Sequence, residues 1–315
     1  MGNQTRPSHR LPDDQTDDFP RAFVPPLPAW VDEFSGNRFR HATARFDGAR
    51  GMDILTFQQR VVEAYKAVLE ELASGEPRHL VRFWAFVPGI HDDLGAGLDR
   101  YMAFNAGRYG AFTSHFGRPT LFGESVPTAS AVGVHGDEFV LYGLSAAVPG
   151  VPVENPRQVS AYHYSRRFGP MPPCFARATL LGGHSDEALL IVGGTASITG
   201  EESRHLDNLQ EQAAETFRNL ASVVASAAGG QLPESAAVSE LEPLLSTFRA
   251  LRVYHTRPGD RAAIAALVQA RFPSSCQVEL LQASLCRQEL LIEIEGVAAP
   301  RRRLGNWTFG LARKP

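Results

Sequence analysis

Apolar residues recur along this chain with two different periods, and together the two periods predict both helices and strands. Between residues 54 and 72 they fall at every third or fourth position, which is the pattern of an amphipathic helix. The same spacing predicts helices over 94–112, 203–227, 239–247 and 259–272. Alternation with a period of two predicts strands at 37–46, 79–87, 130–134, 139–146, 159–164, 175–181, 188–198, 251–255, 277–284 and 289–296.

Glycine-containing segments mark turns between some of these strands. The segment 135–137 (His-Gly-Asp) predicts a hairpin between the strands on either side of it, and the segment 182–185 (Gly-Gly-His-Ser) predicts another. The last two predicted strands, 277–284 and 289–296, are expected to pair with each other.

The order of elements repeats along the chain. Helix, strand, helix, strand, strand runs from Ile54 to Ala146 and again from Ser203 to Gly296. This duplication predicts an α+β fold of two domains with like topology, each a mixed or antiparallel sheet with helices packed on one face. The open face of each sheet must then be covered by another domain or subunit. A cleft between two such sheets is where we expect a ligand.

Composition suggests where the domains begin and end. Residues 1–28 are rich in Pro, Asp and Thr and are expected to form a flexible or draped arm. A segment rich in Pro and Gly at 148–156 predicts a boundary. We therefore expect a first domain over 29–150, a second, catalytic domain over 151–300 and a basic tail over 301–315.

Charge and motif content exclude several classes of function. Of 315 residues 43% are hydrophobic, and the net charge of −3 offers no basic field for nucleic acid or an anionic membrane. There is no membrane-spanning apolar run, no apolar stretch of a secretory signal, and only three cysteines without paired spacing, so we expect a cytoplasmic protein. No metal-binding His or Cys pair and no nucleotide-binding glycine motif occurs, so neither a metal nor a cofactor is expected.

The predicted strand 289–296 carries the most informative carboxylate. Glu293 lies on the same side of this strand as Leu291 and Glu295. It is either an exposed acid on an edge strand or a buried acid placed for chemistry. Cys286, seven residues earlier, is either a small buried hydrophobic residue or part of a site.

The second half of the chain resembles the RidA (YjgF) family, whose fold is shared with a class of small chorismate mutases. The matching stretches are I-V-G-G-T-A-S-I (191–198), E-Q-A-A-E-T-F-R-N-L-A-S-V-V (211–224), S-S-C-Q-V-E-L (274–280) and L-L-I-E-I-E-G (290–296). RidA deaminases carry a substrate-binding arginine just before the S-C-x-V-E stretch, where this chain has Ser274 and Ser275. Deamination of an imine or enamine is therefore not expected.

The whole chain resembles a narrower family, the chorismatases, which build two domains from RidA-like units and remove pyruvate from chorismate. The resemblance is carried by Y-M-A-F-N-A-G-R-Y (101–109), S-A-Y-H-Y-S-R-R-F-G-P (160–170), F-A-R-A-T-L (175–180), G-G-T-A-S (193–197) and the final Cys286 and Glu293. It implies that chorismate is the substrate, and that the protein is a monomer or, like RidA relatives, a trimer.

Chorismate carries two carboxylates, so the resemblance implies a pocket with at least two cations, for which Arg108 and Arg177 are candidates and Arg166 or Arg167 weaker ones. Alternatively, Arg108 reaches out from the edge of the core and Arg177 pairs with a surface carboxylate. Tyr162 is either a donor to a substrate carboxylate or an ordinary strand aromatic. The small residues Gly194, Thr195 and Ala196 are expected to let a ring lie against the backbone, and the position matched to Ala196 is always small in the family.

The resemblance makes Glu293 the general acid that protonates the enolpyruvyl methylene carbon, which requires a carboxyl group kept neutral by an apolar pocket. Cys286 is similar to a cysteine of the branches that release hydroxybenzoate, where it lines the ring pocket. We therefore expect 3-hydroxybenzoate, or 3- and 4-hydroxybenzoate together. Two alternatives remain: the hydrolytic branch, which gives a 3,4-dihydroxycyclohexadiene carboxylate, and a non-catalytic RidA-like protein that only binds a metabolite.

Overall fold

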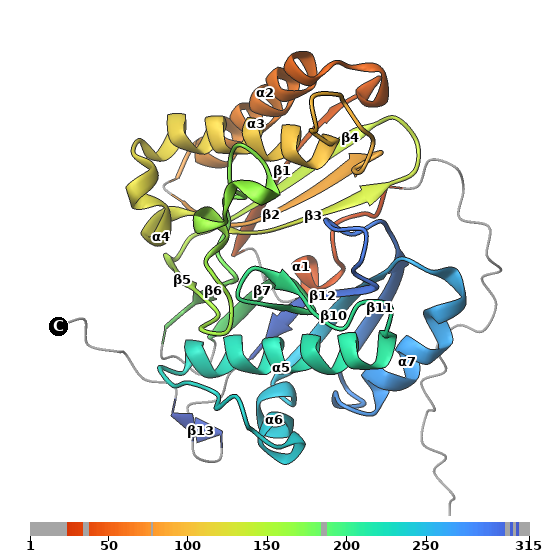
Figure 1. Ribbon diagram of the computed structural model, residues 1–315. Coiled ribbons are helices and arrows are strands. Elements are labelled where there is room, and N and C mark those ends of the chain that lie inside the picture. The colour runs from red at the N-terminus through yellow and green to blue at the C-terminus, as the bar shows by residue number, and fades with distance from the viewer. Residues whose placement is uncertain are drawn as a thin grey trace, which may run out of the picture.

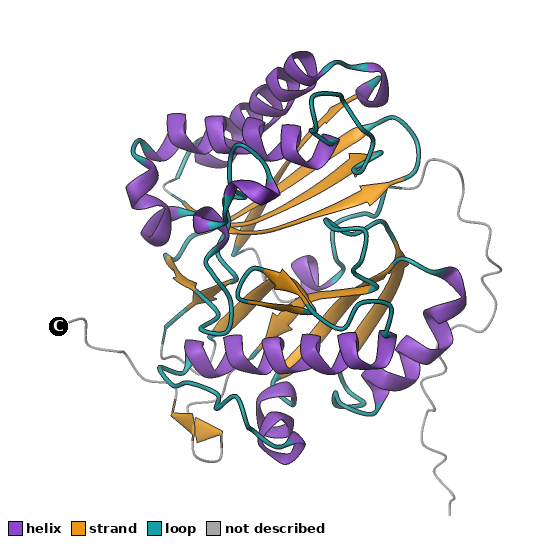
Figure 2. Ribbon diagram, viewed as in Figure 1, coloured by secondary structure: helices purple, strands orange, loops and turns teal. Residues whose placement is uncertain are grey.

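The computed structural model describes residues 24–33, 38–76, 78–183, 188–299, 303–304 and 307–308. Helices cover the outer face of each of two sheets, and the inner faces of the sheets lie against each other (Figures 1 and 2). The molecule therefore has four layers, helices, sheet, sheet and helices, which confirms the predicted α+β class.

The first sheet has the strand order β1-β4-β2-β3. Its outer face packs on helices α2 and α3 through an aromatic core in which Tyr65 lies between Phe83, Phe104 and Phe112. The elements are β1 (Phe39–Phe46), α2 (Ile54–Ala73), β2 (His79–Pro88), α3 (Arg100–Phe116), the short α4 (Phe122–Ser125), β3 (Thr128–Val134) and β4 (Phe139–Ala146).

The second sheet has the order β11-β10-β12-β7-β6-β5. Helix α5 packs its apolar stripe on this sheet, with α6 and α7 beside it. The elements are β5 (Gly150–Val153), β6 (Ala178–Leu181), β7 (Leu189–Ala196), β8 (Ile198–Thr199), β9 (Glu202–Ser203), α5 (Leu209–Ala227), α6 (Val238–Leu245), β10 (Phe248–His255), α7 (Arg261–Gln269), β11 (Gln277–Gln282) and β12 (Ile292–Ala298), followed by β13 (Arg303–Leu304) and β14 (Trp307–Thr308).

The two sheets repeat one topology. In the first, β4 pairs antiparallel with β1 and β2, and β2 pairs in parallel with β3. In the second, β12 pairs antiparallel with β7 and β10, and β10 pairs in parallel with β11. The order of elements from α2 to β4 returns from α5 to β12, which confirms the duplication read from the sequence.

The inner faces of the two sheets meet in an apolar region that we call the inter-sheet layer. It contains Trp84 and Phe86 from the first sheet and Ile191 and Tyr254 from the second. The short helix α1 (Trp30–Glu33) packs here as well, with the Trp30 ring 5.8 Å from that of Trp84. Each sheet thus covers the open face of the other, as the duplication required.

Two predicted strand pairings are wrong. Segment 135–137 joins β3 to β4, but β2 lies between these strands in the sheet. In the same way β10 lies between β11 and β12. In the first half α3 connects β2 to its parallel neighbour β3, and β4 then pairs with the other edge of β2. In the second half α7 connects β10 to β11, and β12 pairs with the other edge of β10. Strands that follow each other in the sequence therefore do not pair. The hairpin of β6 and β7 is confirmed.

The bounds of several predicted elements differ from those observed, and three differences are the largest. Segment 159–164 is not a strand: residues Ala161–His163 form a 3₁₀ turn, and the bridge between Gln158 and Gly200 just before the segment is isolated. Helix α3 begins at Arg100, later than predicted, after the left-handed glycines 95 and 97 and the N-cap Asp99. Helix α5 begins at Leu209, where the Asn208 side chain accepts a hydrogen bond from the Glu211 amide.

The predicted division at residue 150 stays a prediction, as does the arm 1–28, of which residues 1–23 lie outside the described part of the chain. Most of the basic tail 301–315 lies outside it too. No helix among the described residues is long and apolar enough to span a bilayer.

Candidate active site

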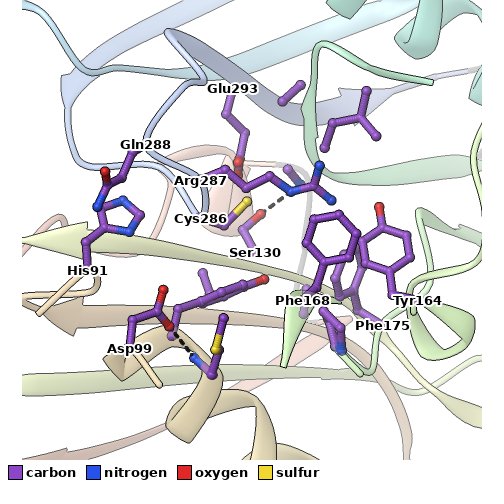
Figure 3. A pocket seen from close by; sticks show the side chains of 18 of the residues that line it. His91, Asp99, Ser130, Tyr164, Phe168, Phe175, Cys286, Arg287, Gln288 and Glu293 are labelled. Atoms are coloured by element: carbon purple, nitrogen blue, oxygen red, sulfur yellow. Dashed lines mark hydrogen bonds between the residues drawn. The ribbon is translucent and has the colours of Figure 1, made fainter. Parts of the chain in front are cut away.

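A cavity of about 280 Å³ opens between the two sheets (Figure 3). Its lining comes from both halves of the chain: from the first sheet and α3 it takes Ala129, Ser130 and Arg108, and from the second sheet Gly194, Ala196 and Glu293. The loop between β5 and β6 and the loop between β11 and β12 complete the wall. The predicted cleft between the sheets is therefore present.

Glu293 lies on β12 and points into this cavity with 4% of its surface exposed. Burial raises the pKa of its carboxyl to about 8, the nearby Glu295 adds to the rise, and Arg82 and Arg177 oppose it. The carboxyl is therefore mostly protonated at neutral pH. Of the two interpretations left open by the sequence, the structure supports the buried acid.

Gly194 makes the room that the Glu293 carboxyl occupies. A Cβ atom at residue 194 would stand 2.0 Å from Oε1 of Glu293. A β-bulge on β7, at residues 193–194 opposite Glu295, sets this local geometry and lets the Gly194 amide donate to Ser130 Oγ. Glycine at 194 is therefore required for the Glu293 carboxyl to occupy its observed position.

Ala196 lines the cavity beside Gly194, whereas Thr195 does not. Thr195 lies between them on the strand, its side chain is buried, and its hydroxyl donates to the Gly193 carbonyl. Alternation along β7 turns this side chain to the opposite face of the sheet. The prediction that Thr195 contacts substrate has no support from this geometry.

Cys286 is partly exposed and lines the cavity from the loop that precedes β12. Burial and then the charge of Glu293 raise the pKa of its thiol to about 12, so the sulfur is a neutral thiol. Gln212, fully buried on α5, fixes this loop: its side chain donates to the Glu289 carbonyl and accepts from the Leu291 amide. The thiol is suited to shaping the cavity and not to nucleophilic attack.

Three arginines line the cavity without a carboxylate partner in any ion pair between described residues: Arg108, Arg177 and Arg287. Arg108 and Arg177 are almost fully buried, and the Nε atom of each has no hydrogen-bond partner within the described chain. Their guanidinium groups lie 5.4 and 5.1 Å from the Phe175 ring centroid. Two buried cations facing one cavity suit a ligand with more than one anionic group.

Arg177 precedes β6 and is held by its own hydrogen bonds. It donates to the Val159 carbonyl and to the Tyr164 hydroxyl, both at 2.8–2.9 Å. Glu154 lies nearby, but burial raises the pKa of that carboxyl while Arg177 opposes the rise. A carboxyl that tends toward its neutral form leaves the charge of Arg177 available to a ligand.

Tyr162 is not among the residues that line the cavity. Its hydroxyl lies against Gly123, where a Cβ atom would be 3.2 Å away, and its ring packs with the first core. The 3₁₀ turn that replaces the predicted strand brings Tyr164 to the cavity in its place. Of the two weaker arginine candidates, Arg167 lines the cavity but is paired with Glu202, and Arg166 is exposed outside it.

The sequence alone did not reveal Arg287, Phe168 or Ser130. The Arg287 side chain lies against the Phe168 ring (Figure 3), with its guanidinium 4.0 Å from the ring centroid. It also donates to the Glu201 carbonyl. The position of Arg287 directly after Cys286 is the feature of the sequence that could have identified it as a site residue. Ser130 falls within the predicted strand 130–134, and its neighbours in the sequence carry no motif that indicates a site. Among the described residues, no group of three or more His, Cys, Asp or Glu side chains could hold a metal ion.

Comparison with known proteins places this site in a family. Residues 36–145 match a family model described as the N-terminal domain of FkbO/Hyg5-like chorismatases. A 3-hydroxybenzoate synthase of Streptomyces hygroscopicus is 33% identical over 238 residues, which cover 74% of this chain and 67% of that protein. This chain belongs to the chorismatase family.

Other members agree with this placement. A chorismatase of Streptomyces rapamycinicus is 31% identical over 224 residues, or 70% of this chain and 64% of that relative's length. The chain thus spans about two thirds of these curated relatives. A crystal structure of a chorismatase matches with a TM-score of 0.70 at 28% identity and covers 83% of this chain and 75% of its own. The resemblance read from the sequence motifs is confirmed.

Proposed function

We propose that this protein removes pyruvate from chorismate and releases 3-hydroxybenzoate, with Glu293 as the general acid. The observation that carries the proposal is a buried, mostly protonated carboxyl in a cavity that also holds two unpaired buried arginines. Family membership supports the same substrate, because one relative is named a 3-hydroxybenzoate synthase and two are named chorismatases.

Substrate binding rests on the arginines. Chorismate has one carboxylate on its ring and another on the enolpyruvyl group. Arg108 and Arg177 approach the cavity from different elements and each keeps an unpartnered Nε atom, so each can take a carboxylate. Arg287 adds a third positive charge at the wall formed by Phe168 and Tyr164. Desolvated cations of this kind discriminate strongly in favour of a dianion.

Glu293 starts the reaction by giving its proton to the methylene carbon of the enolpyruvyl ether. This carbon is a weak base, and a carboxyl with a pKa of about 8 is protonated at neutral pH and ready to donate. Positive charge then develops on the ether carbon, next to the carboxylate that Glu293 has become. Tight cover of the acid by Gly194 and Ala196 keeps bulk water from this step.

The ring completes the reaction without added water. The neighbouring ring hydroxyl attacks the ring carbon that carries the ether oxygen. The bond between that ring carbon and the ether oxygen breaks, and its electrons complete the keto group of pyruvate. The hydroxyl proton returns to Glu293, and the resulting epoxide opens to 3-hydroxybenzoate. Chorismate is thus divided into the two products with no atom gained or lost. A neutral Cys286 thiol beside the acid suits this route, because it fills space where a hydrolytic water would otherwise stand.

Incubation of the purified protein with chorismate tests the proposal. We expect equal amounts of pyruvate and 3-hydroxybenzoate, followed by a lactate dehydrogenase assay and by chromatography. In water labelled with oxygen-18, the aromatic product should carry no label. A non-aromatic dihydroxy acid would identify the hydrolytic branch, in which water adds to the enolpyruvyl carbon and both ring oxygens come from chorismate. A raised melting temperature with intact chorismate would identify a protein that only binds the compound.

Substitution of Gly194 should disable the acid by direct overlap with its carboxyl group. The methyl group of Gly194→Ala would overlap Oε1 of Glu293, so the carboxyl must move, and we expect kcat to fall about 10²-fold. Gly259→Ala is the matched control, because nothing lies within 4 Å of the added Cβ atom there. Steady-state pyruvate release measures both variants. An alanine at 194 that keeps the wild-type kcat would show that the position of Glu293 is not critical.

A further inference from the structure

A second buried carboxylate, Glu295, lies two residues beyond the acid. Both side chains are on the same face of β12, about 7 Å apart along the strand, and Glu295 is 1% exposed. Unlike Glu293, it has a full set of partners. Its Oε2 accepts from Arg82 and Ser130, both at 2.6 Å, and its Oε1 accepts from Trp84 at 2.8 Å and Tyr254 at 3.3 Å.

These donors come from both sheets. Arg82 and Trp84 lie on β2 and Ser130 on β3, whereas Tyr254 lies on β10 opposite Glu293 and reaches Glu295 through its hydroxyl. Ser130 also accepts from Arg82 and from the Gly194 amide, so its one proton is left for Glu295. Burial and the charge of Glu295 raise the pKa of Tyr254, whose hydroxyl therefore stays a donor. The cluster is a polar clasp across the inter-sheet layer, built around one negative charge.

The two carboxyls of β12 have opposite surroundings. Four donors, one of them a guanidinium, hold Glu295 as the anion of an ion pair. Within the described chain no hydrogen bond reaches the Glu293 side chain. Two carboxylates this close in a site of low polarity resist ionising together, and the proton goes to the one without donors.

We propose that Glu295 is a positioning residue for the reaction: a fixed negative charge, built into the clasp between the sheets, that keeps the Glu293 carboxyl protonated. The proposal rests on the function assigned above to Glu293 and adds the means by which the chain holds that acid ready at neutral pH. Arg82 then has two roles. It holds Glu295 as an anion, and its own positive charge partly offsets the effect of Glu295 on the pKa of Glu293.

Other groups around Glu293 set the background. Arg177 opposes the effect of Glu295, and Cys286, Tyr254 and Tyr101 are neutral at physiological pH, because burial raises the pKa of each. The remaining ionisable or charged residues that line the cavity are His91, Asp99, Arg108, Tyr164, Arg167, Arg287 and Glu289. Replacing Glu295 leaves all of them in place, so their contributions are the same in the variant and in wild type.

The test is a titration of the Glu293 carboxyl by NMR in protein labelled with carbon-13 at the glutamate side-chain carboxyl. The Glu293→Gln spectrum identifies the resonance. Wild-type protein should titrate with a midpoint at about pH 8. In Glu295→Gln a like charge is lost and Arg82 is left without its anion, and both changes favour ionised Glu293. The midpoint should therefore move to lower pH by about one pH unit or more. An unmoved or raised midpoint would overturn the proposal.

Kinetics provide the second readout, which a merely structural role would not move. In the pH profile of kcat/KM, the decrease that occurs at high pH should begin at a lower pH in Glu295→Gln than in wild type. If it moves by about one pH unit, pyruvate release at pH 8 should drop about fivefold while activity at pH 6 is kept. Glu279→Gln is the matched control, since it also removes a carboxylate paired with a buried arginine, away from the cavity. Its midpoint and the pH of this decrease should stay at the wild-type values.

A second variant covers the case in which Glu295→Gln does not fold. The double variant Arg82→Met with Glu295→Gln removes both charges and leaves no unpaired ion. Its Glu293 midpoint should still lie below that of wild type, because Glu295 acts on this carboxyl more strongly than Arg82 does. A midpoint at or above the wild-type value would overturn the proposal. Since the NMR titration needs no turnover, it decides this proposal even if chorismate is not the substrate.

Discussion

Replacement of Glu293 by glutamine should lower kcat for pyruvate release by about 10²–10⁴-fold, which is the usual contribution of a general acid. Glutamine has nearly the shape of a protonated glutamic acid but no proton that it can give to carbon. Other contacts to the substrate are unchanged, so we expect KM to stay close to its wild-type value. The residual rate of the variant should not follow the wild-type fall toward pH 8, because no protonation state of an amide restores the acid.

The same variant should fold as well as wild type. The folded protein holds Glu293 with a pKa of about 8, well above that of an unfolded glutamate, so the stability that comes from its bound proton is lost as pH rises toward 8. The amide needs no proton, and thermal unfolding at pH 8 should therefore occur at an equal or higher temperature in Glu293→Gln.

Glu289→Gln is the control for this experiment. Glu289 lies at the same cavity and accepts a hydrogen bond from Ser203, but it is exposed. Loss of its carboxylate should change kcat by no more than about twofold. Wild-type turnover in Glu293→Gln would remove this residue from the mechanism. An equal loss in both variants would mean that the charge of the cavity, and not one proton, is decisive.

Periodicity was sufficient to predict much of the fold. Helix α2 and strand β4 were predicted almost to the residue, because α2 packs one regular apolar stripe on the first core and β4 is an unbroken apolar run buried on both faces. The repeated order of elements predicted two sheets whose open faces need cover, and the inter-sheet layer provides it. The pairing of β3 with β4, and of β11 with β12, was predicted wrongly, since strand order depends on crossovers that local pattern does not encode.

The candidate site divides in the same way between strands and loops. Glu293 and Ala196 lie on paired strand positions, so alternation predicts which face of the sheet their side chains take, and the structure brings both together with Gly194 of the bulge at one cavity. The same alternation predicts that Thr195, between Gly194 and Ala196, faces the opposite side of the sheet and does not line the cavity. Glycine at 194 was expected to admit a substrate ring, but the bulge and the Glu293 carboxyl take that space.

Loop residues could not be placed in this way. Tyr162 and Tyr164 are equally plausible from the sequence, and the 3₁₀ turn between Ala161 and His163 decides which one reaches the cavity. Arg287 and Phe168 meet there although their loops are far apart in the sequence. Such contacts follow from how two loops of the second half of the chain pack on each other, which no local pattern expresses.

Arg177→Met should raise KM for chorismate by about 10–100-fold, the loss expected when a charged hydrogen bond to a carboxylate is removed from a buried site. The arginine is 4% exposed, and its Nε atom has no partner within the described chain. Methionine keeps most of the stem but offers no donor, so the two carboxylates of the substrate would share one fewer cation. Steady-state rates over a range of chorismate concentrations measure the effect.

The pH profile of Arg177→Met tests the cause of this loss. Arg177 opposes the rise in the pKa of Glu293, so its removal should move the falling limb of the profile upward, the reverse of the change expected for Glu295→Gln. Arg166→Met, an exposed position on the neighbouring loop, should leave both KM and the limb unchanged. Arg177→Lys should recover part of the affinity, because it restores the charge without the bidentate geometry. If Arg177→Met kept the wild-type KM while remaining folded, the substrate carboxylate would have to be bound by Arg108 and Arg287, and Arg177 would serve only to hold Tyr164 and the Val159 carbonyl in place.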